Sequence, residues 1–142
     1  MDNIIIEKIW NDSDISNTGL FEVKLTCITE YIIINENVYM NDSLVKEFAN
    51  IIEEYIANNK ETRLGIPIKE GHTPGFEMKI LPFDKHGHIL IEIIMEIDDN
   101  DKKLHSAIFY IKTEIGLLEK FRLKLNKLLN LEIGEKISLN FN

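Results

Sequence analysis

The chain has little of several residue types, and each shortage excludes a class of protein. Cys27 is the only cysteine and cannot form an internal disulfide, which excludes a disulfide-stabilised secreted scaffold. No apolar run reaches the roughly 18 residues that a membrane-spanning helix needs. The N-terminus lacks the basic and apolar regions of a signal peptide, so we expect a cytoplasmic protein. Cys27 lies in an apolar strand-like run, so we expect its thiol to be buried and unreactive.

Basic residues are scarce in the first part of the chain. Residues 1–60 contain four lysines and eleven carboxylates, a net charge of −7, whereas residues 61–142 contain twelve basic and thirteen acidic side chains. Nearly all of the formal net charge of −8 therefore lies in the first part. Such a charge distribution repels nucleic acids and anionic membranes and attracts a basic protein surface.

Composition and hydrophobic periodicity predict one α+β domain over residues 1–142. A hydrophobic fraction of 44% and a charged fraction of 28% are typical of a globular protein, and no linker or low-complexity segment divides the chain. Short strands joined by turns, without alternating strand–helix units, favour a largely antiparallel sheet with two helices. The expected order is β-β-β-α-β-β-β-β-α-β.

Several local signals define the ends of these elements. Residues 35–37 (Asn-Glu-Asn) predict a turn that interrupts the third strand, and Pro67 predicts an edge strand. One of residues 41–43 (Asn-Asp-Ser) is expected to cap the first helix, and Thr113 the second. Apolar residues on the inner faces of these elements predict one core beneath both helices that contains Phe48, Ile52, Ile91, Phe109, Phe121 and Leu125.

The strands expected at 88–97 and 104–112 have a second apolar face if they pair as a hairpin. Its apolar residues are Leu90, Ile94, Ile108 and Tyr110, and its rim is formed by Glu92 and Glu96. Two interpretations are open. Either a helix or a second layer covers this face, or it is an exposed patch with an acidic rim, as partner-binding sites often are.

One pair of histidines has the spacing of metal ligands. His86 and His88 could act together if both lie on one face, with Asp84, His72 or His105 completing the set. The intervening glycine and the turn composition favour a polar hairpin turn instead, so we expect no metal and no cofactor. No phosphate loop or nucleophile elbow is present, and we expect a protein that is not an enzyme.

From residue 75 onward the sequence resembles the WapI-type immunity proteins. The resemblance rests on a Gly-Phe pair at residues 75 and 76, on Gly-His-Ile-Leu-Ile-Glu-Ile at 87–93, and on Ala-Ile-Phe-Tyr-Ile at 107–111. It continues through Thr113 and Leu117 into the last helix. These proteins are small bacterial cytoplasmic antitoxins that protect a cell from its own contact-delivered toxin. The resemblance implies a toxin-binding protein without catalytic residues.

The first hypothesis is therefore an immunity protein that binds and neutralises a cognate basic toxin domain, with a nuclease as the expected class. Acidic inhibitors of such enzymes gain association rate from charge steering and cover the basic substrate cleft. Acidic side chains and aromatic anchors are the candidate binding residues. They are Glu22, Asp42, Glu47, Glu53, Glu54, Glu92, Glu96, Tyr39, Tyr55 and Tyr110.

Two other hypotheses belong to different classes. A small acidic secretion or assembly chaperone would bind its partner through the apolar sheet face. The least favoured hypothesis is a metal-dependent enzyme centred on His86 and His88. All three leave the oligomeric state open between monomer and homodimer, and the charge distribution excludes nucleic acid and membrane as partners.

Overall fold

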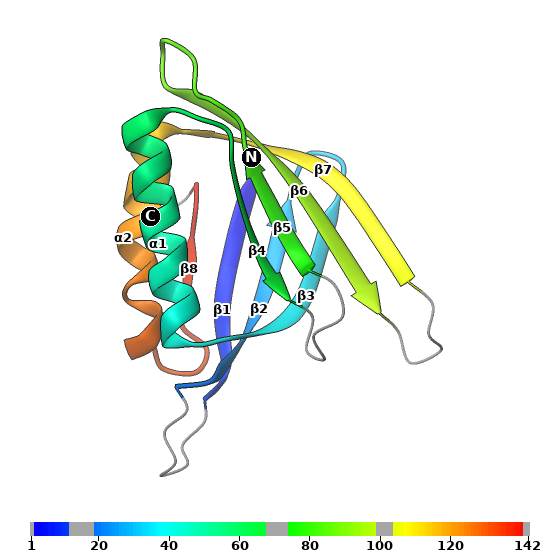
Figure 1. Cartoon of the computed structure of the whole chain (residues 1–142). Helices are drawn as coiled ribbons and strands as arrows, with labels where there is room; N and C mark the ends of the chain where they lie inside the picture. Colours follow the sequence, from blue (N-terminus) through cyan, green and yellow to red (C-terminus); the bar gives the residue numbers. More distant parts are fainter. Residues whose placement is uncertain (1, 12–18, 68–73, 99–103, 141–142) are drawn as a thin grey trace.

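The protein consists of two four-stranded antiparallel sheets and two helices (Figure 1). The computed structural model describes residues 2–11, 19–67, 74–98 and 104–140. Its elements are β1 (Asn3–Asn11), β2 (Phe21–Ile28), β3 (Ile33–Met40), α1 (Asp42–Asn58), β4 (Thr62–Pro67), β5 (Pro74–Ile80), β6 (His88–Asp98), β7 (Leu104–Glu114), α2 (Ile115–Leu125), the 3₁₀ helix η1 (Leu128–Asn130) and β8 (Lys136–Ser138). The predicted α+β class and element order are confirmed.

The first sheet, sheet A, has the strand order β3-β2-β1-β8. Its strands alternate between buried and more exposed residues, so one face of the sheet lies in the core and the other faces outward. β3 is continuous through residues 35–37, which corrects the predicted interruption. The eight-residue pairing of β3 with β2 overrides the turn propensity of the two asparagines, whose side chains lie on the exposed face.

The second sheet, sheet B, has the strand order β4-β5-β6-β7. Pro67 ends the edge strand β4, as predicted, since a proline cannot donate to a neighbouring strand. The turn between β5 and β6 is also confirmed: Gly87 adopts a φ of 80°, and its N–H donates to the carbonyl of Asp84 at 3.0 Å. Residues 98–102 (Asp-Asp-Asn-Asp-Lys) and 71–75 (Gly-His-Thr-Pro-Gly) have the compositions of a turn and a loop, and both segments lie mostly outside the described residues.

Helix α1 begins and ends at asparagines. The Asn41 side chain accepts a hydrogen bond from the N–H of Leu44 at 2.9 Å, which caps the first turn. Asn59 ends the helix in the left-handed conformation with a φ of 51°. The Asn59 side chain also bonds both backbone groups of Phe83, so the end of α1 is tied to the segment that leads into β6.

Helix α2 has no side-chain cap, which corrects the prediction for Thr113. The N-cap residue is Glu114, and Thr113 is buried at the end of β7. The Thr113 hydroxyl donates instead to the side chain of Asn140 at 2.7 Å. A long-range contact with the end of the chain has therefore replaced the local capping bond that the sequence favours.

One core joins both sheets and both helices, and it contains all six residues predicted for it. The helices lie side by side at one side of the sheets (Figure 1). The Lys8 side chain is buried in this core: its ammonium donates to the carbonyls of Leu128 and Leu129 and lies 4.8 Å from the centre of the Phe21 ring. Lys8 thus supplies donors for carbonyls at the end of the helical segment.

The outer faces of both sheets carry exposed residues. Ile108 and Tyr110 on sheet B are 65% and 48% exposed, and Ile33 on sheet A is 68% exposed. Cys27 is buried, as predicted, and burial raises the pKa of its thiol to about 12. Among the described residues, no helix has the length and apolar character needed to cross a membrane.

Candidate functional site

The ten predicted binding residues do not form one surface. Asp42, Glu47, Glu53 and Glu54 lie on α1, Glu22 and Tyr39 on sheet A, and Glu92, Glu96 and Tyr110 on sheet B. Tyr55 lies in the core. The structure therefore divides the candidates among three separate surfaces, each of which requires its own interpretation.

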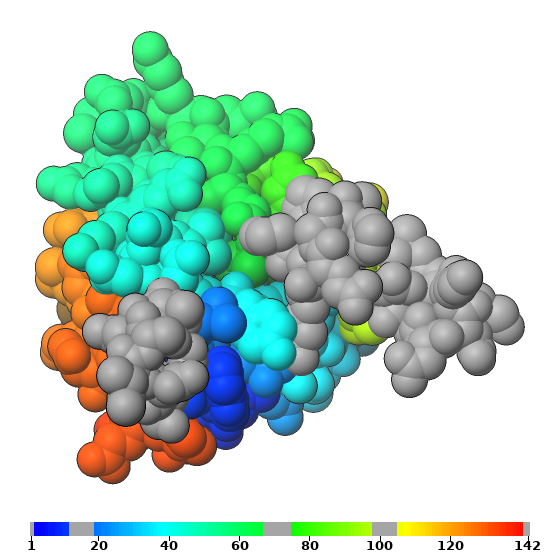
Figure 2. Space-filling model, turned by 60° about the horizontal axis from the view of Figure 1, so that its bottom comes forward, coloured from blue at the N-terminus to red at the C-terminus, as the bar shows by residue number. Residues whose placement is uncertain are grey.

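The acidic face of α1, defined by Asp42, Glu47, Glu53 and Glu54, is open to solvent, and Figure 2 shows the exposed surface of α1 in cyan to green. Two of its carboxylates are partly compensated: Asp42 pairs with Lys46 at 3.0 Å, and Glu53 with Arg122 of α2 at 3.8 Å. Glu47 and Glu54 form no ion pair with another described residue. These two carboxylates give the acidic face its uncompensated charge.

Tyr55 is not available to a partner, which corrects its prediction as an anchor. It is 1% exposed, and its hydroxyl donates to the carbonyl of Leu81 at 2.6 Å. Its ring packs edge-to-face against Phe83, with 5.9 Å between ring centres. Burial raises the pKa of Tyr55 to about 12. The aromatic ring lies on the apolar side of α1, so its role is to attach the helix to the segment before β6.

Glu22 and Tyr39 are neighbours on the outer face of sheet A. Tyr39 of β3 and Trp10 of β1 are both paired with Glu22 of β2, so the three residues form a row across three strands. The rings of Trp10 and Tyr39 approach edge-to-face with centres 6.3 Å apart, and Trp10 is 42% exposed. Trp10 was missed from the sequence because nothing local placed it beside Tyr39.

The outer face of sheet B is the exposed patch that one of the two interpretations predicted. β6 and β7 pair as expected and put the four apolar residues of the hairpin on one side. The Tyr110 hydroxyl donates to the Glu92 carboxylate at 3.0 Å, and this hydrogen bond raises the pKa of Tyr110. Lys79 lies 3.7 Å from Glu92. Neither helix covers the patch, because Ile108 and Tyr110 stay largely exposed.

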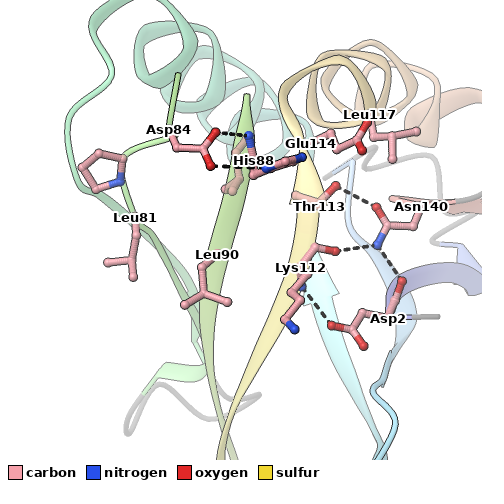
Figure 3. Close-up of a pocket in the computed structure, with 12 residues that line it drawn as sticks. Asp2, Leu81, Asp84, His88, Leu90, Lys112, Thr113, Glu114, Leu117 and Asn140 are labelled. Carbon is pink, nitrogen blue, oxygen red and sulfur yellow. Dashed lines mark hydrogen bonds and ion pairs between the residues drawn. The ribbon is translucent and has the colours of Figure 1, made fainter. Parts of the chain in front are cut away.

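A pocket of about 700 Å³ lies at the end of this face where β6 begins and β7 ends (Figure 3). Apolar and polar side chains line it together. The lining residues are Asp2, Leu81, Pro82, Asp84, His88, Ile89, Leu90, Lys112, Thr113, Glu114, Leu117 and Asn140. This mixture of an apolar floor and converging polar groups is common in binding sites.

The polar groups on one side of this pocket hold the hairpin turn. Asp84 accepts a hydrogen bond from the backbone N–H of His88 at 2.9 Å and lies 3.2 Å from His88 Nδ1 (Figure 3). It also accepts a hydrogen bond from the backbone N–H of His86 at 2.8 Å. These bonds lower the pKa of Asp84, and the hydrogen bond from the His88 backbone has the largest effect. Asp84 is therefore a turn-stabilising carboxylate, kept ionised by its backbone donors.

The two ends of the described chain meet on the other side of the pocket. Asn140 donates to the carbonyls of Asp2 and Lys112, and it accepts from Thr113 (Figure 3). The N–H of Lys112 donates to the Asp2 carboxylate at 2.9 Å. This network ties both ends to the outer edge of β7.

The rings of His86 and His88 lie 6.1 Å apart between centres and are tilted by 47°. No group of three or more histidine, cysteine, aspartate or glutamate side chains suited to a metal occurs among the described residues, and His72 lies outside them. His88 instead faces Asp84. Within the described residues, Asp84 is engaged with the backbone of the turn and with His88, and the two histidines do not form a three-ligand group with it.

Searches with protein-family models and among curated proteins find no match to this chain. The surfaces described above therefore have to be interpreted from their own geometry and charge.

Proposed function

We propose that this protein is an immunity protein that binds and neutralises a basic toxin domain, a nuclease being the class that fits an acidic inhibitor. The proposal follows the resemblance of residues 75–129 to WapI-type immunity proteins. The observation that carries it is the exposed acidic face of α1 in a chain of net charge −8. A basic substrate-binding cleft is the surface such a face complements best.

Neutralisation by this route requires no chemistry from the inhibitor. Charge steering raises the rate at which the partners meet, and the bound inhibitor then excludes the substrate from the cleft. Glu47 and Glu54 are the residues we assign to steering, because neither is paired within the described chain. Glu53 contributes less, since Arg122 lies beside it. The cytoplasm is the compartment in which such a protein would protect the producing cell.

The proposal predicts a secreted-toxin gene directly upstream of this one, and the test uses the toxin domain which that gene encodes. Replacing Glu47, Glu53 and Glu54 with glutamine should lower the association rate roughly tenfold and change the dissociation rate little, since exposed charges act mainly on encounter. Stopped-flow or surface-binding kinetics measure both rates. The variant should fold normally because all three side chains are exposed.

A matched control removes the same charge elsewhere. Glu61, Glu132 and Glu135 are exposed and lie outside helix α1. Their replacement with glutamine should slow association clearly less than the triple change on α1. Equal effects of the two triples would attribute steering to net charge alone, and no binding by the wild-type protein would refute the proposed function.

A secretion or assembly chaperone is the second candidate, and the exposed apolar face of sheet B favours it. Ile108 and Tyr110 are exposed apolar side chains, whereas none of the large exposed hydrophobic residues in the described chain lies on α1. A chaperone would bind an unfolded secreted segment with little dependence on salt. A metal-dependent enzyme centred on His86 and His88 has less support, because no group of three or more side chains suited to a metal occurs in the described part of the chain.

A further inference from the structure

The outer edge of β7 has backbone groups that no other strand of the described chain pairs with. β7 is the last strand of sheet B. At Lys112 the N–H donates to Asp2 and the carbonyl accepts from Asn140, so both groups point away from β6. Because these directions alternate along an antiparallel strand, the backbone groups of Ile108 and Tyr110 point the same way. Among the described residues nothing bonds to them.

Two hollows that share Asp2 and Lys112 lie along β7: one beyond Lys112, and one that borders Ile108 and Tyr110 directly. The first is the pocket shown in Figure 3. The second, of about 610 Å³, lies between β7 and the turn that joins β2 to β3, and its apolar lining includes Ile32 and Phe109. A chain laid along residues 106–110 could therefore place side chains in the second hollow and, at its end near Lys112, approach the first, as an added strand does.

The side chains along the edge are apolar and exposed. Ile108 is 65% exposed, Tyr110 48%, and Tyr31 of the neighbouring turn 90%. Natural proteins usually protect such an edge with charges, prolines or a covering segment, because it pairs readily with other chains. Here the protection begins at Lys112, where the side chains of Asp2 and Asn140 occupy the backbone groups. The unprotected stretch is residues 106–110.

The charge around the two hollows selects the occupant. Their lining contains four carboxylates, those of Asp2, Glu30, Asp84 and Glu114, and one lysine, Lys112. With neutral histidine this is a net charge of −3. A second copy of the chain would bring the same negative field to the edge and be repelled, whereas a strand with basic residues would be attracted.

We propose that residues 106–110 of β7 accept an extended strand of a partner protein, with apolar residues alternating with lysine or arginine, as a fifth strand of sheet B. The backbone of Ile108 and Tyr110 supplies the hydrogen bonds, the second hollow receives side chains of the strand, and the negative charge around the two hollows selects basic residues. This inference adds a second contact surface to the one proposed on α1, and it rests on the proposed function for the identity of the partner as a basic toxin domain.

The first experiment uses two synthetic peptides, one of alternating valine and lysine and one of alternating valine and glutamate. The lysine peptide should slow hydrogen exchange of the Ile108 and Tyr110 amides in the wild-type protein, whereas the glutamate peptide should not. Equal effects of the two peptides, or no protection of these amides at millimolar lysine peptide, would overturn the proposal.

The second experiment removes the outward N–H. In Ile108→Pro the lost N–H is not part of the β6–β7 ladder, so the fold is kept, and affinity for the lysine peptide should fall about tenfold or more. The matched variant Ile108→Ala loses the side chain and keeps the N–H, so it should bind more tightly than Ile108→Pro. Exchange in the wild-type protein tests the pairing even if Ile108→Pro does not fold.

Two further outcomes separate this inference from the alternatives. A wild-type protein that is dimeric in sedimentation, and monomeric as Ile108→Pro, would assign the edge to a second copy and overturn the proposal. A toxin domain that binds the wild type and Ile108→Pro equally would refute the strand-addition site and leave the proposed function standing. If the lysine peptide binds at β7 and the toxin does not bind at all, the proposed function is refuted and the strand-addition site is retained.

Discussion

Glu36 is the carboxylate whose pKa is raised most clearly among the described residues. It lies on the inner side of β3, half-buried, and its Oε2 atom has no hydrogen-bond partner among the described residues. Burial, and then the nearby charge of Glu96, raise the pKa of Glu36 to about 7. The sequence predicted a turn here, so the partial burial of this side chain could not be foreseen.

Glu36 should make the stability of the protein depend on pH. The pKa of Glu36 is higher in the folded protein than its unfolded value of about 4.3. The contribution of Glu36 to the free energy of unfolding is therefore fully present below about pH 4.3, and it is lost as pH rises through about 7. At pH 8, Glu36→Gln should be more stable than the wild type by on the order of 1 kcal/mol, a figure discounted for solvent screening. Urea unfolding should show equal stabilities of the two proteins near pH 4.

A Glu54→Gln control should leave the pH dependence of stability unchanged. A Glu36→Gln variant that keeps the pH dependence of the wild type would contradict the prediction.

Lys8 is the second residue whose surroundings are unusual for its charge. Its burial lowers the pKa of the ammonium, but hydrogen bonds to two carbonyls and the Phe21 ring compensate the group. We expect Lys8→Met to lower the free energy of unfolding by about 1–3 kcal/mol, because the two carbonyls lose a donor. Lys24→Met, on the exposed face of the adjacent strand, should change it by less than about 0.5 kcal/mol. Equal losses for both variants in urea unfolding would contradict this role.

At the scale of the elements, the two helices contribute one phenylalanine each to the contact with the sheets. Phe48 of α1 and Phe121 of α2 are buried in the common core. Truncating either to alanine should cost about 3–5 kcal/mol, which threatens the stability of a typical small domain. Leu123 of α2 is 50% exposed, and Leu123→Ala should cost clearly less. Thermal or urea unfolding measures all three, and a loss below about 1 kcal/mol at both phenylalanines would contradict the assigned core.

Helix ends show how far local signals reach. The cap of α1 was predicted to lie at residues 41–43, and Asn41 is the residue that caps it. The prediction that Thr113 caps α2 was wrong, because the Thr113 hydroxyl has a buried partner in Asn140, 27 residues away in sequence. A capping bond is worth about 1 kcal/mol, so a buried tertiary hydrogen bond can replace it.

At the scale of the whole molecule, the uneven charge predicts that salt weakens association. Exposed charges are screened beyond about 8 Å at physiological ionic strength. The association rate with a basic toxin domain should therefore fall roughly tenfold between low and high salt, with a smaller change in the dissociation rate. Binding kinetics over a salt series measure this dependence. Binding that is indifferent to salt would shift the function toward the apolar contact of a chaperone.

The sequence by itself determined the α+β class, the element order, the core residues and the acidic character of α1. These follow from hydrophobic period, helix-cap and turn residues, and charge, all of which act over a few neighbouring positions. Only the tertiary structure decided that the strands divide into two sheets, that Tyr55 is buried, that the outer face of sheet B is uncovered and that the edge of β7 is open. These features depend on which distant segments meet, as Asp2 and Asn140 do at Lys112. Local sequence patterns do not specify such contacts, because the free energy of burying one face is nearly the same whichever element covers it.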